Sequence, residues 1–419
     1  MKRGEFQLLK KSKFIYILLL LPAAVFFNTY RSLPSDIHLT QNSRYLLNVG
    51  SFCNISADSL EASADSGALS AKNADGILLN TENTGTYKLN VKMFNFIPIK
   101  TVDVTVAPQY SVIPSGSPVG IKIYADGLLT VNVSDVRDSA GKSFSPARDA
   151  GIRVGDRIVS AGGKALSTSE QLSKILNSAD GSVTLGVMHG DNLNEMTVTP
   201  ILSGDGQKKI GIWVRDSTAG VGTLTFYDPK TSSFATLGHA ITDVDTGDII
   251  LPRSGSISDC KIAYSTKSTA GNPGELSGIF GNASFGKILL NSQMGVYGKT
   301  NESAEFYGEG YMPVATRFQV KNGAAYIMAD VDGGGVKKYS VDIEEVSKSS
   351  NCGNKGLVIR ITDPALLEKT GGIVQGMSGA PIIQNSMLVG AVTHVFVNEP
   401  DKGYGIFAEN MLDIVLKLQ

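Results

Sequence analysis

Cysteine, histidine and tryptophan are scarce in this sequence, and their scarcity excludes several kinds of site. Three cysteines, four histidines and one tryptophan occur among 419 residues. Cys53, Cys260 and Cys352 include no Cys-x-x-Cys pair, which argues against a structural zinc site. Cys260 and Cys352 could form a disulfide in an exported protein, but three small unpaired thiols are the simpler interpretation.

The sequence also lacks an excess of either basic or acidic residues. Lys and Arg total 38 while Asp and Glu total 39, so the formal net charge is −1. A protein that binds nucleic acid carries a basic surface, so this balance disfavours DNA and RNA as partners. The sequence contains no phosphate loop, dinucleotide fingerprint, His-Glu-x-x-His motif or solenoid repeat. It therefore predicts no metal and no cofactor.

Glycine and short strand-like segments dominate what is present. The 46 glycines separate short alternating runs of Val, Ile and Thr, a pattern typical of β structure with many turns. The length leaves room for two or three domains. The sequence therefore predicts a mainly β protein with few long helices.

The N-terminus has the features of an export signal. Lysines and an arginine within residues 1–13 precede an uncharged stretch from Phe14 to Tyr30. That stretch is at the short end of the ~17–25 residues that span a bilayer, and Leu21–Phe27 offers no good small-x-small cleavage site. We therefore predict an uncleaved membrane anchor with its N-terminus in the cytoplasm, from which later proteolysis can release the protein.

Changes in composition divide the chain into four parts. We predict a tail and anchor helix at residues 1–30, a linker and small β region at 31–108, a PDZ domain at 109–202 and a larger β domain at 203–419. Ala150–Val159 is the strongest PDZ-like signature, and a helix that begins near Ser169 is expected to form one wall of the groove.

Val119, Gly120 and Ile121, within Pro118–Ile123, are predicted to belong to the carboxylate-binding loop and its strand, which form the other wall of that groove. A PDZ groove binds an extended peptide as an added strand, and N–H groups of its loop receive a terminal carboxylate. We therefore expect a peptide or a protein C-terminus as a ligand. The alternative is a spacer with a PDZ fold and no ligand, because a fold alone does not establish a site.

The run Gly376-Met377-Ser378-Gly379 is the strongest chemical feature of the chain. Glycines beside a serine allow a tight turn that exposes the hydroxyl and directs peptide N–H groups toward one point. Ser378 is therefore a candidate nucleophile, and the N–H groups of Gly376 and Ser378 are candidates for an oxyanion hole. A serine nucleophile also needs a base, and His239, where a buried-looking strand breaks at Gly238, is the best candidate.

The other histidines and the acidic residues leave alternatives open. His38 and His189 are expected on the surface, and His394 is expected to be a strand histidine near the serine turn. A carboxylate that orients the base could come from the acidic turn Asp243–Asp248, or from Asp363 before Pro364. Asp363 could equally cap the helix that the following residues predict.

Five segments together resemble the stage IV sporulation protein B family of sporulation serine peptidases: Gly211–Asp216, Gly220–Phe226, Leu237–Ile241, Asn272–Leu276 and Gly371–Gly379. The resemblance implies a chymotrypsin-like double β-barrel with His239, Asp363 and Ser378 as base, orienting acid and nucleophile. The order His, Asp, Ser agrees with chymotrypsin-like enzymes. The acid lies nearer the serine than the histidine, however, which departs from the usual spacing.

These observations predict an exported, membrane-anchored serine endopeptidase whose PDZ domain presents protein substrates. The resemblance further implies that it acts between the mother-cell and forespore membranes. There it would cleave itself and a membrane-bound regulatory protein, which starts late sigma-factor activation. The alternative from another class is a catalytically silent PDZ adaptor for membrane-protein partners. An acyl esterase is a third possibility, although no lipid pocket is suggested.

Overall fold

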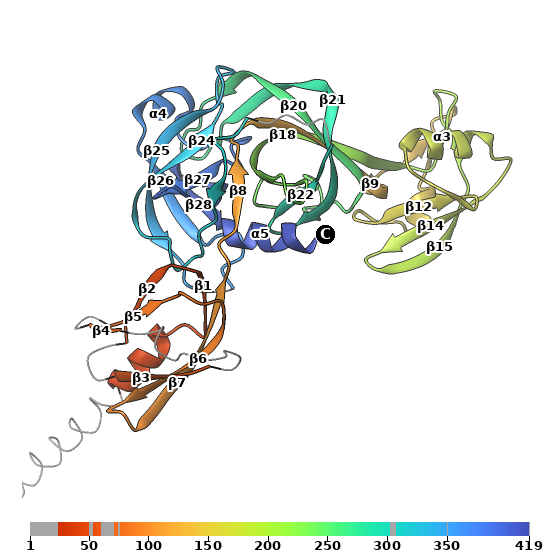
Figure 1. Cartoon of the computed structure of the whole chain (residues 1–419). Coiled ribbons are helices and arrows are strands. Elements are labelled where there is room, and N and C mark those ends of the chain that lie inside the picture. The colour runs from red at the N-terminus through yellow and green to blue at the C-terminus, as the bar shows by residue number, and fades with distance from the viewer. Residues whose placement is uncertain are drawn as a thin grey trace, which may run out of the picture. The chain divides into compact units, whose positions relative to one another are not determined.

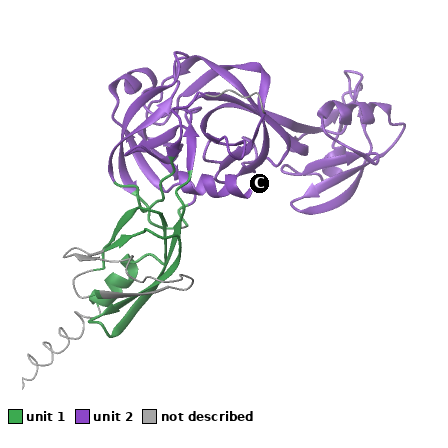
Figure 2. Cartoon of the chain, in the orientation of Figure 1, with its two compact units in different colours: residues 1–110, 313–321, 346–352 green, residues 111–312, 322–345, 353–419 purple. Residues whose placement is uncertain are grey.

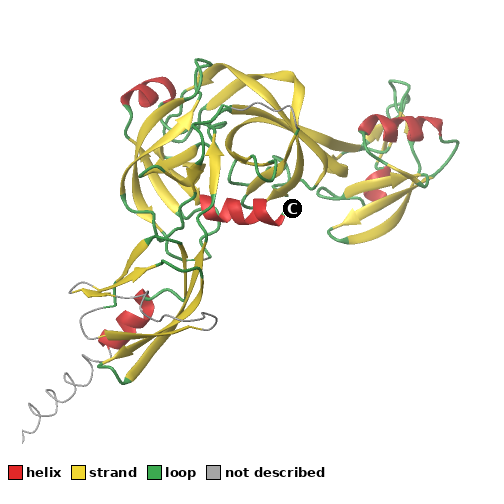
Figure 3. Ribbon diagram, in the orientation of Figure 1, coloured by secondary structure: helices red, strands yellow, loops and turns green. Residues whose placement is uncertain are grey.

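The protein is built mainly of β-strands, which form two compact units. The computed structural model describes residues 24–49, 53–59, 71–73, 76–301, 307–349 and 351–418. One unit contains residues 1–110, 313–321 and 346–352, and the other contains residues 111–312, 322–345 and 353–419 (Figure 2). Strands predominate in both units, as Figure 3 shows.

The first unit is a small β structure with one helix at residues 24–32. Its strands are β1 (Asp36–Thr40), β2 (Arg44–Leu47), β3 (Cys53–Ser59), β4 (Ala71–Asn73), β5 (Gly76–Asn80), β6 (Gly85–Met93) and β7 (Ile97–Ala107), in two sheets of order β1-β7-β6-β3 and β2-β5-β4. Alternate side chains of β6, including Leu89 and Val91, are buried in its core.

The second unit begins with a six-stranded barrel. Its strands are β9 (Pro118–Val133), β18 (Ile212–Asp228), β19 (Ser233–Thr236), β20 (Pro252–Thr266), β21 (Glu275–Ser292) and β22 (Gly295–Thr300). The order β9-β20-β21-β22-β19-β18 closes on itself because β18 also pairs with β9. Ile123, Phe234 and Ile257 are fully buried inside this ring. Two short strands lie beside the ring, β8 (Ser111–Pro114) and β23 (Met312–Pro313).

The PDZ-like part is inserted into the first barrel between β9 and β18 (Figure 1). It contains β10 (Val136–Arg137), β11 (Ser143–Phe144), α2 (Pro146–Asp149), β12 (Arg157–Ala161), β13 (Lys164–Ala165), α3 (Ser169–Ser178), β14 (Val183–His189), β15 (Asn192–Val198), β16 (Ile201–Leu202) and β17 (Lys208–Lys209). Leu128, Ile158 and Leu185 are fully buried in its own core. The helix predicted near Ser169 is α3, and Thr168 caps it by accepting from Gln171 N.

The predicted boundaries at residues 109 and 202 therefore differ from those observed. Residues 118–126 belong to the first barrel, and the inserted part extends to the start of β18. The reason is that β9 is one continuous strand, which leaves the barrel and enters the insertion with a register shift between Tyr124 and Leu129.

The second barrel is formed by β24 (Gly323–Ala329), β25 (Lys337–Val346), β26 (Leu357–Ile361), β27 (Pro381–Gln384), β28 (Met387–Phe396) and β29 (Glu399–Phe407). It closes in the order β24-β25-β26-β29-β28-β27. Helix α4 (Pro364–Thr370) follows β26, and α5 (Ala408–Lys417) packs against strands of both barrels, namely β19, β22, β28 and β29. The predicted mainly β architecture with a PDZ domain and a β-barrel is confirmed.

Most of the predicted membrane anchor, residues 1–23, lies outside the described residues. Among the helices that the structure does describe, none is long and apolar enough to cross a membrane. Cys53, Cys260 and Cys352 are all thiols, so the possible Cys260–Cys352 disulfide is absent.

Candidate active site

A cleft of about 460 Å³ brings the candidate nucleophile and base together. Ser378 and Gly376 line it from the turn before β27, and His239 lines it from the loop after β19. Thr218–Val221 of β18 and Thr393–Val395 of β28 complete its walls. Two side chains that are remote in sequence therefore share one cleft, as the sequence predicted.

The serine turn of the second barrel is hydrogen-bonded to β18 of the first. The Thr223 N–H donates to Ser378 O at 3.0 Å, and Thr223 Oγ1 donates to Gly376 O at 2.8 Å. Thr225 Oγ1 donates to Gly379 O at 2.8 Å. Both threonines are buried, so water does not compete for these bonds and the turn is held in place.

Two amides of this turn are left without an acceptor. The N–H groups of Gln375, Met377 and Gly379 donate to Gly274 O, Val374 O and Val392 O, respectively. Those of Gly376 and Ser378 donate to no acceptor within the described part of the chain. Gly376 has a φ of 96°, which favours glycine. Two unpaired N–H groups beside a serine are the arrangement that stabilises an oxyanion.

The hydroxyl of Ser378 is held at the rim of β28. Its Oγ donates to Thr393 O at 2.8 Å. The adjacent residue in β28, His394, also lines the cleft. In this state the hydroxyl hydrogen of Ser378 points to the Thr393 carbonyl oxygen, and rotation about χ1 is needed to direct the hydroxyl to a base.

His239 is positioned by a left-handed backbone turn. Leu237 and Gly238 have φ angles of 68° each, and a Cβ on Gly238 would lie 2.8 Å from side-chain atoms of Ile406 and Thr393. His239 Nδ1 lies 2.8 Å from Ala240 O. Because a carbonyl oxygen only accepts, Nδ1 carries the hydrogen and Nε2 of the neutral ring has a free lone pair.

Burial lowers the pKa of His239 below its usual value, although the contact with the Ala240 carbonyl opposes that shift. The imidazole is therefore neutral, and able to accept a proton, at neutral pH. Asn291 fixes the same loop: its Oδ1 accepts from Ile241 N at 2.9 Å, and its Nδ2 donates to Ile241 O at 2.8 Å and to Ile250 O at 2.9 Å.

His394 lies next to His239 in the cleft, which the sequence did not indicate. The two ring centroids are 4.8 Å apart, with the planes inclined at 38°. Desolvation, followed by repulsion from His239 and Lys355, lowers the pKa of His394 to about 4. The sequence predicted His394 near the serine turn but not its contact with His239, because that contact depends on how the two barrels pack.

Asp363 is not brought to His239. It is the N-cap of α4, where its Oδ1 accepts from Ala365 N at 3.0 Å and Leu366 N at 3.1 Å, and its Oδ2 accepts from Ser340 N at 3.2 Å. It does not line the cleft. The alternative expected from Asp before Pro, a helix cap, is the role that the structure gives this side chain.

The acidic turn after His239 is also engaged elsewhere. Asp243 is buried and accepts from Arg215 Nη1 at 2.5 Å, while Asp245 accepts from Arg215 Nη2 at 2.7 Å. Asp243 Oδ1 additionally accepts from the N–H groups of Asp245 and Thr246. The described residues therefore supply no carboxylate to the Nδ1 of His239, whose partner is the Ala240 carbonyl.

Comparison with protein-family models identifies the domain that contains this cleft. Residues 206–412 match the model of the SpoIVB peptidase S55 family, and residues 137–187 match the PDZ domain model. The chain belongs to the SpoIVB peptidase S55 family. It is a serine peptidase, which is the activity of that family. The resemblance found in the sequence is thereby confirmed.

Two further comparisons add little to this assignment. No curated protein matches the chain. Among solved structures, the PDZ domain of an SdrC-like protein from Listeria monocytogenes is 25% identical over 21% of this chain and 87% of that chain, with a TM-score of 0.18.

The prediction that Val119, Gly120 and Ile121 form the carboxylate-binding loop of the PDZ domain is wrong. Val119, Gly120 and Ile121 lie in β9, where Gly120 is opposite Val221 of β18 on one edge and Ser258 of β20 on the other. Both edges are occupied, so a peptide strand cannot be added there. The side chains of Val119 and Ile121 are buried in the first barrel.

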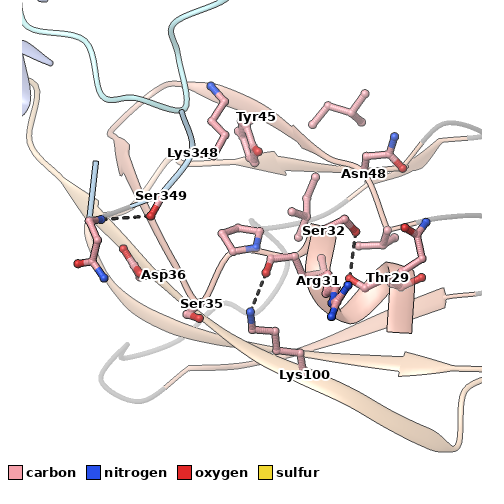
Figure 4. Close-up of a pocket in the computed structure, with 17 residues that line it drawn as sticks. Thr29, Arg31, Ser32, Ser35, Asp36, Tyr45, Asn48, Lys100, Lys348 and Ser349 are labelled. Atoms are coloured by element: carbon pink, nitrogen blue, oxygen red, sulfur yellow. Dashed lines mark hydrogen bonds between the residues drawn. The ribbon is translucent and has the colours of Figure 1, made fainter. Parts of the chain in front are cut away.

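A second, more polar cavity of about 740 Å³ lies within the first unit of the peptidase (Figure 4). Both lysines of this cavity bond carbonyl groups: Lys100 Nζ donates to Leu33 O and Lys348 Nζ donates to Arg317 O, each at 2.6 Å. No histidine or cysteine lines it. It therefore lacks the parts of a nucleophilic site.

We expect replacement of Asp363 to affect stability rather than chemistry. Asn caps a helix about as well as Asp, so Asp363→Asn should lose only the Ser340 bond and retain the rate of hydrolysis within about threefold. Asp363→Ala should lower the free energy of unfolding by about 1–2 kcal/mol. Denaturant unfolding and peptidase assays check this. A folded Asp363→Asn protein that loses about 10⁴ in kcat would identify an orienting acid instead.

We expect Asn291→Ala to loosen the histidine loop. Removal of the amide takes away the partners of Ile241 N and Ile250 O and leaves Ile241 O only its bond from Ile250 N, which should lower the free energy of unfolding by about 2–3 kcal/mol. Asn301→Ala is the matched control, because its exposed amide makes one bond, to Ser284 O, and its loss should change stability by less than about 0.5 kcal/mol. Urea unfolding of both variants measures the difference, and equal effects would contradict the role of Asn291.

Proposed function

We propose that this S55 peptidase is an exported, membrane-anchored serine endopeptidase in which Ser378 is the nucleophile and His239 is the general base. The observation that carries the proposal is the pair of unpaired amides, Gly376 N and Ser378 N, in the cleft that Ser378 and His239 share. Both residues are half-buried at the wall of the cleft, so their N–H groups are accessible to a carbonyl oxygen bound beside Ser378.

In the proposed reaction, Ser378 Oγ attacks the carbonyl carbon of the scissile bond while His239 Nε2 takes the hydroxyl proton. The carbonyl oxygen becomes an oxyanion and accepts from the N–H groups of Gly376 and Ser378. His239 then donates its proton to the leaving amine, and the peptide C–N bond breaks. A water molecule then attacks the acyl-enzyme while His239 Nε2 takes one of its protons. The ester bond to Ser378 breaks, the second product leaves, and His239 returns the proton to Ser378 Oγ.

The orientation of His239 would come from the main chain. A carbonyl that accepts from Nδ1–H selects the same tautomer as a carboxylate does, and Ala240 O is in that place. A carbonyl carries no full charge, so it stabilises the imidazolium less than an aspartate. We infer that His239 acts without Asp363, and that this peptidase depends more heavily on its rigid oxyanion hole.

The substrates that we propose are the protein itself and a membrane-bound regulatory protein of sporulation. Family membership and the PDZ domain support protein or peptide substrates. The signal-like N-terminal sequence supports export to the space between the forespore and mother-cell membranes, where limited cleavage would start signalling. A catalytically silent adaptor has no need for free amides beside Ser378, so the geometry favours the enzyme over that alternative.

The first test is covalent labelling with a fluorophosphonate. Wild-type protein should be labelled at Ser378, and Ser378→Ala should abolish both labelling and self-processing. Ser254→Ala is the matched control, because this exposed serine of β20 lies outside the cleft and should label normally. Undiminished labelling of Ser378→Ala would remove the proposed nucleophile.

The second test is the pH dependence of that labelling. Imidazolium cannot accept a proton, so the rate should fall on the acidic side with the pKa of His239. Burial lowers the pKa of His239, so the acid limb should lie below pH ~6.5, the value for an unperturbed histidine. A carboxylate partner would raise that pKa instead. An acid limb centred at pH 7 or above would therefore contradict the carbonyl-paired base.

A further inference from the structure

Strand β18 has one edge without a partner along more than half of its length. From Ile212 to Thr223 it pairs with β9 on one side. On the other side β19 begins only at Leu224, and among the described residues no other strand or loop bonds the backbone of residues 212–222 on that edge. An open edge of this length is a template for an added strand.

The cleft end of this edge faces the nucleophile. Thr223 directs its N–H to Ser378 O and its C=O to Thr236 Oγ1, away from β9. Because backbone groups alternate along a strand, Val221 and Ala219 also direct their N–H and C=O groups to the open edge. Both residues line the cleft, and a side chain built on the intervening Gly220 would meet nothing within 4 Å.

The opposite end of the same edge lies beside helix α3. Asp216 Oδ2 accepts from the N–H of Ser169, at the start of α3, at 2.9 Å. Lys208 N donates to Asn177 Oδ1, at the end of α3, at 2.9 Å. The side chains of Ile212 and Val214 pack against the PDZ core. The start of β18 and α3 are therefore the two walls of the PDZ groove, in the place that the sequence assigned to Val119–Ile121.

The loop that leads into β18 has the features of a carboxylate site. The N–H groups of Ile210 and Gly211 donate to no acceptor among the residues that the structure describes. Gly211 has a φ of 81°, and a Cβ there would lie 2.2 Å from Ser134 O. Consecutive free amides in such a turn bind anions.

We propose that one extended polypeptide segment binds along the whole free edge of β18, with its C-terminal carboxylate at the Ile210 and Gly211 amides and its scissile bond at Ser378. The inference rests on the proposed function, because it names the substrate class of that cleft: chains with a free, unfolded C-terminal tail. A carboxylate at the start of β18 requires an antiparallel tail. The tail therefore runs from the cleft toward the insertion as the part of the substrate that follows the cleaved bond.

The strand sets the distance between the cut and the end of the substrate. Antiparallel strands pair residue for residue at about 3.4 Å per residue, so the edge from Thr223 to Ile212 accommodates a tail of about ten residues. The insertion and the cleft then act as a ruler, which selects a bond by its distance from the C-terminus as well as by its side chains.

The test uses N-acetylated synthetic peptides of about 25 residues with randomised sequence, prepared either as free acids or as C-terminal amides. The full-length protein digests both pools, and mass spectrometry locates the cuts. Free acids should be cut mainly about ten residues from the C-terminus. Amides should lose that clustering and be cut about tenfold more slowly, because the charged hydrogen bonds at the loop are lost.

The outcomes separate this inference from the function on which it rests. Cleavage at positions unrelated to the C-terminus, equal for acids and amides, overturns the ruler and leaves the peptidase intact. Absence of both cleavage and fluorophosphonate labelling of Ser378 overturns the proposed function and this inference together.

Strand pairing itself is tested on both sides of the contact. N-methylation of successive tail amides should slow cleavage about tenfold at alternate positions only, since every second N–H faces β18. Ala219→Pro removes one edge N–H of the protein where proline is tolerated. Relative to its own rate of fluorophosphonate labelling at Ser378, the variant should cleave peptides about tenfold more slowly than the wild type does. Unchanged peptide cleavage by a labelled Ala219→Pro protein, or uniform effects of N-methylation, overturns the strand-addition model.

Discussion

The catalytic geometry depends on the hydrogen bonds by which β18 of one barrel holds the serine turn of the other. Thr223 bonds the turn at Gly376 and Ser378, and Thr225 bonds it at Gly379. The approach is close: a Cβ on Gly379 would lie 2.1 Å from Thr223 O. These bonds hold the turn in place, and the amides of Gly376 and Ser378, which have no acceptor among the described residues, can bind an incoming oxyanion. The same strand then offers its open edge to the substrate.

The histidine side of the cleft follows a different principle. Its loop is held by Asn291 and by the left-handed pair Leu237–Gly238, so the ring is oriented by the main chain. Burial lowers the pKa of His239, and the nearby His394 ring contributes no opposite charge. Desolvation therefore keeps His239 neutral, and the site relies on preorganised amides rather than on a buried carboxylate.

Local signals in the sequence predicted the parts of this site that depend on local chemistry. The turn at Ser378, the break at Gly238 and the alternating strands of two barrels were all predicted. Long-range pairing decided the rest. Val119–Ile121 have the pattern of a PDZ loop, yet both edges of β9 are filled by strands remote in the sequence. At Asp363 the local signal of Asp before Pro was the informative one, and the helix cap prevailed over the expected triad.

The most direct measurement of this account is a crystal structure of the protein phosphonylated at Ser378 by a fluorophosphonate. The account predicts that the phosphonyl oxygen lies about 2.7–3.1 Å from both Gly376 N and Ser378 N. It also predicts that His239 Nε2 faces the ester oxygen while Nδ1 keeps its hydrogen bond to Ala240 O. A phosphonyl oxygen bound by other donors, or a carboxylate seated against His239 Nδ1, would contradict it.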